Sequence, residues 1–190
     1  MTAAGHTVEN EESITALNLL NDTHFIIGEA SLTPSVAEIT TLSSWVHGGG
    51  VLLVFSDSGG DGFAGGNAIL SGIGSAMNFG GSPPIVAPFV GGNFASVGPP
   101  YDIVGQTLTV SPGNEVSGGN ILAGSYVHYE HLGSGWAFAF GDRLDHNFFL
   151  PNNSTVNGQL FLNITAVPEP STLALILFSA LLGLVKVKSS

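Results

Sequence analysis

The 190-residue chain contains no cysteine and only three basic residues. Without a thiol it can form no disulfide, carry no cysteine nucleophile and hold no cysteine-ligated zinc or iron–sulfur centre. Its fourteen acidic residues bring the formal net charge to −11 at pH 7. Two of the three basic residues, Lys186 and Lys188, lie near the C-terminus, and Arg143 is the third. A surface this acidic repels phosphate backbones, so the sequence argues against a nucleic-acid partner.

The most specific pattern lies between residues 167 and 188. It opens with a stiff stretch that resists helix formation, because each proline fixes its own φ and disfavours helix in the preceding residue. That stretch consists of Val167, Pro168, Glu169, Pro170 and Ser171. Residues 172–185 then carry no charge. As a helix this run reaches about 21 Å, less than the ~30 Å hydrocarbon core of a bilayer.

The apolar run could form either a buried helix of the globular domain or a helix that lies in a membrane. By length alone it suits a buried helix of the globular domain, whereas lysines that snorkel to the interface make a membrane span feasible. We predict a membrane anchor, because the run is apolar on all sides and follows a proline break. The anchor residues are Leu173, Leu175, Ile176, Leu177, Phe178, Leu181, Leu182, Leu184, Val185, Lys186 and Lys188. The terminal lysines then place the C-terminus in the cytoplasm and residues 1–166 outside it.

This order of Pro-Glu-Pro, apolar run and basic end resembles the PEP-CTERM sorting signal of exported bacterial proteins. The resemblance implies that an exosortase, a transpeptidase-like enzyme of the inner membrane, cuts the chain near Pro-Glu-Pro. It also implies a destination at the cell envelope or outside the cell, and a link with exopolysaccharide and biofilm matrices. Residues 1–23 lack the basic and apolar regions of a secretory signal. We therefore expect that the start is placed too late or that the chain is a truncated remnant.

Strand and helix patterns alternate along the preceding part of the chain. Apolar runs predict strands at residues 22–30, 51–55, 121–130 and 136–140, with helices at 68–73 and 156–164. Thr33 is the expected N-cap and Pro34 the expected first residue of another helix, which ends before three glycines. The last two strands are expected to form a hairpin with His128 opposite Ala139. The alternation predicts an α/β protein with a mainly parallel sheet flanked by helices.

Three stretches of the chain read LTPSVAEITTLSSWVHGGGVLLVFSD, GSGWAFAFGDRLDHNFFL and NGQLFLNIT. They resemble glutamine-amidotransferase-like, flavodoxin-like domains of exported proteins. The resemblance implies a flavodoxin-like domain over residues 1–166 that lacks its first strand, followed by the sorting signal over residues 167–190. The catalytic cysteine of that family is missing here, so amidotransferase chemistry is not implied.

Acidic side chains gather in the two predicted loops that follow the strands 51–55 and 136–140. Ligands of open α/β sheets collect at the carboxyl ends of parallel strands, where carboxylates and imidazoles can hold Ca²⁺ or another divalent cation. The candidate metal ligands are Asp57, Asp61, Asp142, Asp145 and His146. The alternative is structural, with a solvated turn after the first strand and Asp142 capping a turn after the second.

Two other groups of residues are weaker candidates for chemistry. Alternation along a strand puts His128 and Glu130 on one face and His131 on the other, which argues against one shared metal site. Ser56 follows the strand 51–55, where hydrolase-like folds place a nucleophile, but no Gly-x-Ser-x-Gly elbow surrounds it.

These observations favour an exported cell-surface or matrix protein whose domain is a non-catalytic binding or structural module. The expected partners are the exosortase, the inner membrane and extracellular polysaccharide. The alternative is an extracytoplasmic, cation-dependent hydrolase that uses Asp57, Asp61, Asp142 or His146. No cofactor other than such a cation is expected.

Overall fold

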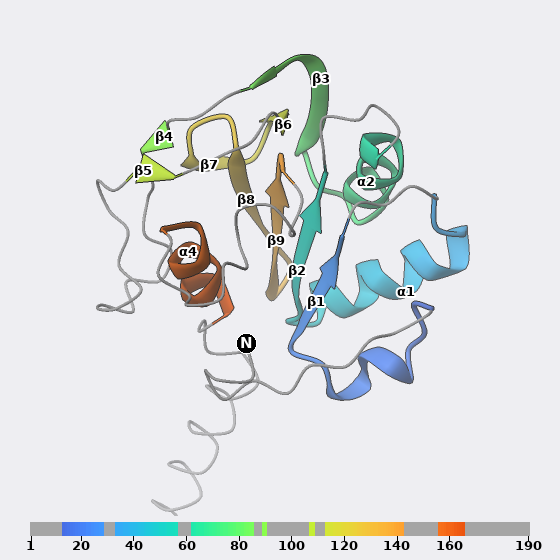
Figure 1. Cartoon of the computed structure of the whole chain (residues 1–190). Helices are drawn as coiled ribbons and strands as arrows, with labels where there is room; N and C mark the ends of the chain where they lie inside the picture. Colours follow the sequence, from blue (N-terminus) through green and yellow to red (C-terminus); the bar gives the residue numbers. More distant parts are fainter. Residues whose placement is uncertain are drawn as a thin grey trace, which may run out of the picture.

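A five-stranded mixed sheet forms the centre of the protein (Figure 1). The computed structural model describes residues 13–28, 33–56, 62–85, 89–90, 107–108, 113–142 and 156–165. The strands, in their order across the sheet, are β1 (His24–Ile27), β2 (Val51–Phe55), β9 (Gly135–Phe140), β8 (Val127–Leu132) and β7 (Asn120–Ala123). The first three are parallel, and β8 and β7 are added antiparallel. The prediction of an α/β sheet flanked by helices is confirmed in this mixed form.

Helices cover both faces of the sheet. Helices α1 (Val36–His47) and α2 (Gly62–Gly72) lie on one face, and α4 (Val156–Thr165) lies on the other (Figure 1). Alternate side chains of β2 point to the two faces, so Leu52 and Val54 pack under α1 and α2 while Leu53 packs towards α4. All five β2 residues are buried. This explains the uninterrupted apolar run of the strand, since a doubly covered strand has no solvent face.

The remaining elements are short. A 3₁₀ helix, η2 (Asn18–Asn21), precedes β1. Two antiparallel ribbons pair β3 (Asn78–Ile85) with β6 (Gly113–Ser117) and β4 (Phe89–Val90) with β5 (Thr107–Leu108). The β3–β6 ribbon lies beyond the carboxyl ends of β2 and β9 (Figure 1). Backbone N–H groups of β6 bind the chain there, with 2.6 Å from Asn114 N to Gly141 O and 2.7 Å from Val116 N to Ser125 O.

The start of α1 corrects the sequence prediction. Ser35, rather than Thr33, is the N-cap, and Pro34 lies before the helix. The Ser35 hydroxyl accepts a hydrogen bond from the Glu38 N–H, and the Glu38 carboxylate accepts one from the Ser35 N–H at 2.9 Å. This reciprocal capping box requires an acid three residues after the cap, and Val36 occupies that place relative to Thr33.

Two further boundaries differ from the predictions. The predicted strand 121–130 is two strands, β7 and β8, separated by a turn in which Gly124 adopts a φ of +52°. The hairpin of β8 and β9 is confirmed, with His128 paired to Ala139. Helix α2 begins at Gly62, before the predicted residue 68. Its glycines have low helix propensity, but a side chain at Gly66 would run into the Phe79 ring, so close packing favours glycine there.

Several predictions fall outside the described residues. These are the missing first strand, the sorting signal at Val167, Pro168, Glu169, Pro170 and Ser171, and the anchor helix over residues 172–188. They stay predictions. Within the described ranges, none of the helices combines the length and apolar character needed to cross a bilayer.

Candidate functional site

The carboxyl edge of the parallel strands collects polar side chains, as the sequence predicted. Ser56 directly follows β2 and Asp142 lies just after β9. Parallel pairing aligns Phe55 with Phe140, and the Ser56 N–H donates to the Phe140 carbonyl at 2.9 Å. Ser56 and Asp142 are therefore brought to the same edge, where both have 0% exposed surface.

Two residues that no sequence pattern had singled out complete this cluster. Asn114, from β6, donates from Nδ2 to Ser56 Oγ at 2.7 Å and is buried. Tyr126 is fully buried, and its carbonyl accepts from the Gly141 N–H at 2.9 Å. We call Ser56, Asn114, Tyr126 and Asp142 the carboxyl-edge cluster. Asn114 stands 58 residues from Ser56, so only the tertiary fold makes them neighbours.

The electrostatics of the cluster keep the phenol of Tyr126 neutral. Burial is the main cause that raises the pKa of Tyr126 well above its ordinary value, and the negative charge of Asp142 raises it further. A phenolate here would lose its hydration and face a carboxylate. Tyr126 can therefore serve as a hydrogen-bond donor but not as a base near neutral pH.

The geometry around Ser56 differs from that of a serine nucleophile. Its hydroxyl lies in the protein interior and accepts a hydrogen bond from the Asn114 side-chain amide, whereas a nucleophilic serine donates its hydroxyl proton to a general base. A nucleophilic serine needs a base in hydrogen-bond contact and access to substrate. The position after β2 agrees with the sequence prediction, but the observed contact is one that stabilises the fold.

Replacing Ser56 by alanine tests this structural role. We expect the free energy of unfolding to fall by about 1–3 kcal/mol, because the buried Asn114 amide loses this acceptor. Urea unfolding followed by circular dichroism measures the change. Ser71→Ala serves as the control, since Ser71 is an exposed serine of α2. Equal stability of the two variants would contradict the role.

The predicted metal ligands are described only in part. Asp142 lies in the carboxyl-edge cluster, whereas Asp57, Asp61, Asp145 and His146 lie outside the described residues. Among the residues that the structure describes, no group of three histidine, aspartate or glutamate side chains is arranged to hold a metal ion. The cation site stays a prediction.

The histidines of β8 serve separate roles, in agreement with the predicted alternation. The ring nitrogens of His128 lie 2.6 Å from the Gly118 carbonyl oxygen and 3.0 Å from that of Gly124. Glu130 accepts hydrogen bonds from the Ser75 hydroxyl and the Ala76 N–H. His131 packs against the Trp136 ring, with 4.4 Å between ring centroids. These contacts join β8 to its neighbours and do not converge on one point.

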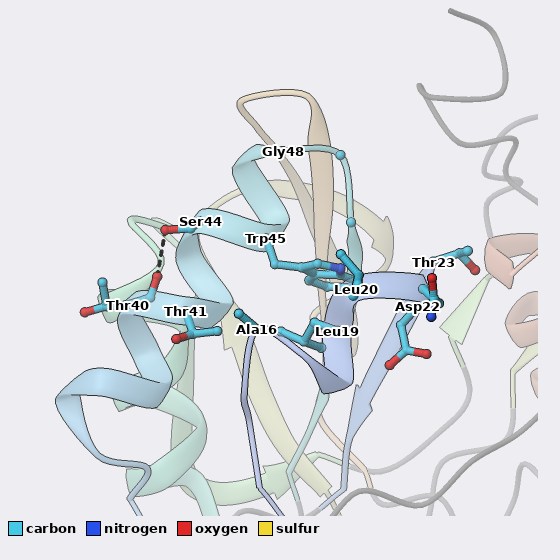
Figure 2. Close-up of a pocket in the computed structure, with 13 residues that line it drawn as sticks. Ala16, Leu19, Leu20, Asp22, Thr23, Thr40, Thr41, Ser44, Trp45 and Gly48 are labelled. Atoms are coloured by element: carbon cyan, nitrogen blue, oxygen red, sulfur yellow. Dashed lines mark hydrogen bonds between the residues drawn. The ribbon is translucent and has the colours of Figure 1, made fainter. Parts of the chain in front are cut away.

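A pocket of about 600 Å³ opens at the opposite, amino edge of the sheet (Figure 2). It lies between η2, the C-terminal half of α1 and the residues that precede β1 and β2. The lining residues are Ala16, Leu19, Leu20, Asn21, Asp22, Thr23, Thr40, Thr41, Ser44, Trp45, Gly48, Gly49 and Gly50. We call this the amino-edge pocket. No sequence pattern had indicated it, because its walls come from two separate segments and Trp45 reads as a core residue of its helix.

The Trp45 ring is held firmly in the wall of this pocket. A side chain at Gly50 would overlap the indole, so the ring packs directly against the Gly50 backbone. Phe25 meets it edge-on, with 6.3 Å between centroids and 74° between ring planes. Trp45 is only half-buried, and Figure 2 shows it reaching across the pocket towards Leu20. Packing on these sides fixes the ring at the surface of the hollow.

No protein-family model matches the chain, and no curated protein sequence matches it. Solved structures do resemble it. The mmIFT52 N-terminal domain has a TM-score of 0.60 at 16% identity, over 83% of this chain and 84% of that one. A cytoplasmic protein, STM3548 from Salmonella typhimurium, has a TM-score of 0.56 at 11% identity, over 84% of this chain and 77% of that one. At such identities the likeness establishes the fold alone.

Proposed function

We propose that this protein is an exported cell-surface or matrix protein, sorted through its Pro-Glu-Pro signal, whose α/β domain binds a ligand without transforming it. The observation that carries the binding role is the amino-edge pocket, whose volume of about 600 Å³ lies within the range of small-molecule sites. At the carboxyl edge, where such folds usually place their chemistry, Ser56 and Asp142 are enclosed. We therefore assign ligand binding to the amino-edge pocket and a structural role to the carboxyl-edge cluster.

The fold contributes a second part of the proposal. The parallel order of β1, β2 and β9, with helices on both faces, supports descent from a flavodoxin-like, amidotransferase-like domain. The competing function is a cation-dependent hydrolase, which needs a stoichiometric divalent cation in the purified protein. Elemental analysis of that protein separates the two functions.

The sorting step is tested by expressing the full chain behind an export leader in cells with and without an exosortase. We expect only the cells with the enzyme to yield a product that lacks the residues after about 170, because the enzyme is expected to recognise Pro-Glu-Pro. Intact-mass spectrometry of the membrane and medium fractions measures the product. A variant with Glu169→Ala controls for unrelated proteolysis and should keep the full mass. Identical masses in both cell types would contradict the proposal.

A further inference from the structure

The hydroxyl groups on the helical wall of the amino-edge pocket are arranged as acceptors. Thr40 Oγ1 donates to the Val36 carbonyl at 2.7 Å, Thr41 Oγ1 to that of Ala37 at 3.0 Å, and Ser44 Oγ to that of Thr40 at 3.0 Å. Figure 2 shows the last of these bonds. Since each hydroxyl proton is already engaged, the oxygens offer lone pairs to an incoming ligand. This wall therefore suits a ligand that donates hydrogen bonds.

The backbone N–H groups beside these hydroxyls are already used in hydrogen bonds within the protein. The N–H groups of Gly48, Gly49 and Gly50 donate to carbonyls in the last turns of α1, at 3.0–3.2 Å. The C-terminus of a helix carries a partial negative charge, and Asp22 is among the residues that line the same hollow. Anionic ligands such as phosphates, sulfates and uronates are repelled by this environment. The net charge of −11 acts in the same direction.

Trp45 supplies the apolar part of the pocket. Its ring is fixed by Phe25 and the Gly50 backbone, so little side-chain freedom is lost when a ligand packs on it. An indole offers a broad apolar surface beside polar groups. A ligand matched to this wall has an apolar face for the ring and several hydroxyl donors around its edge.

We infer that the amino-edge pocket binds a neutral pyranose sugar residue. A pyranose combines a face of C–H groups with equatorial hydroxyls, which matches the ring of Trp45 beside the acceptors of Thr40, Thr41 and Ser44. The inference rests on the proposed function for one point, namely that the sugar belongs to an extracellular polysaccharide. The chemistry of the pocket supports the sugar itself independently.

The test uses Trp45 as its own reporter. The chain has two tryptophans, so Trp136→Phe leaves Trp45 as the single indole fluorophore. The purified full-length chain in detergent is titrated with neutral gluco-, galacto- and manno-oligosaccharides, up to about 10 mM, tenfold above a Kd of about 1 mM. We expect a saturable change in Trp45 emission with at least one neutral series. An oligogalacturonate, which carries carboxylates, and tetramethylammonium, a cation without hydroxyls, are titrated in parallel and should cause none.

A matched pair of serine variants assigns the binding to the pocket. Ser44→Ala should weaken the Kd by about threefold to tenfold, the effect of one lost hydrogen bond. Ser71→Ala, an exposed helical serine on α2 outside the pocket, should leave the Kd unchanged. The inference is overturned if no neutral sugar alters the emission, if the anionic or cationic probe binds as well, or if both variants behave alike. Sugar binding without exosortase processing would contradict the proposed sorting and support the pocket assignment. Processing without sugar binding would contradict the pocket assignment and support the proposed sorting.

Discussion

Replacing Gly141 by alanine is expected to destabilise the protein by about 3 kcal/mol, at the upper end for an overpacked interior. A methyl group at this position would overlap the carbonyl oxygen of Asn114 and approach the ring of Tyr126. Neither neighbour can move easily. Gly141 accepts a hydrogen bond from the Asn114 N–H and donates one to the Tyr126 carbonyl, so its backbone joins β6 to β9. The absence of a side chain lets the β3–β6 ribbon lie directly over the carboxyl-edge cluster.

Urea unfolding of Gly141→Ala, followed by circular dichroism, measures this loss. Gly28→Ala is the matched control, because Gly28 is exposed and an added methyl group would meet no atom within 4 Å. Its free energy of unfolding should change by no more than about 0.5 kcal/mol. Two variants with the same unfolding midpoint would show that the close contact with Asn114 is not essential to the fold.

The buried phenol of Tyr126 should make the protein lose stability in alkali. In the unfolded chain a tyrosine releases its proton near pH 10, whereas burial and Asp142 raise the pKa of Tyr126 in the folded protein well above that. The stabilisation from this group is thus complete below about pH 10 and is lost as the pH rises towards the folded pKa. The expected loss is about 1.4 kcal/mol per pH unit, because one proton is released on unfolding.

Comparison with Tyr126→Phe isolates this effect from other groups that titrate in alkali. The free energy of unfolding is measured by urea titration at intervals between pH 8 and pH 12. The wild-type protein should lose more stability than the variant above about pH 10, and the difference should grow as the pH rises towards pH 12. Tyr129→Phe is the control, because Tyr129 is only half-buried on the adjacent strand. Parallel curves for the wild type and Tyr126→Phe would contradict a neutral, desolvated phenol.

Much of the fold was predictable from local sequence because its determinants lie close together in the chain. The run of five apolar residues in β2 predicts a strand that is buried on both faces, and helices pack on both faces of this strand in the structure. The turn between β8 and β9 sets the hairpin register and therefore the pairing of His128 with Ala139. The predicted N-cap of α1 was wrong by two residues. Ser35 and Glu38 form a reciprocal capping box, which Thr33 cannot form because Val36 stands three residues after it.

The candidate sites were less predictable, because their parts come from distant segments. The sequence placed Ser56 and Asp142 at one edge, since both follow parallel strands. It contained no signal for Asn114, which approaches Ser56 only because β6 crosses that edge. Trp45 shows the same limit. Helical spacing identifies it as apolar, but only the packing against Gly50 and the approach of η2 turn its ring into the wall of a pocket.

The sequence alone determined the acidic, thiol-free chemistry of the chain and the alternation of strands and helices, and it predicts a sorting signal near the C-terminus. These features depend on composition and short-range pattern. Tertiary structure alone decided that Ser56 and Asp142 are buried beside Asn114 of β6, and that a pocket opens at the amino edge next to Trp45. The burial and the hydrogen-bond partners of a residue depend on tertiary contacts between distant segments. Spacing along the sequence does not specify those contacts.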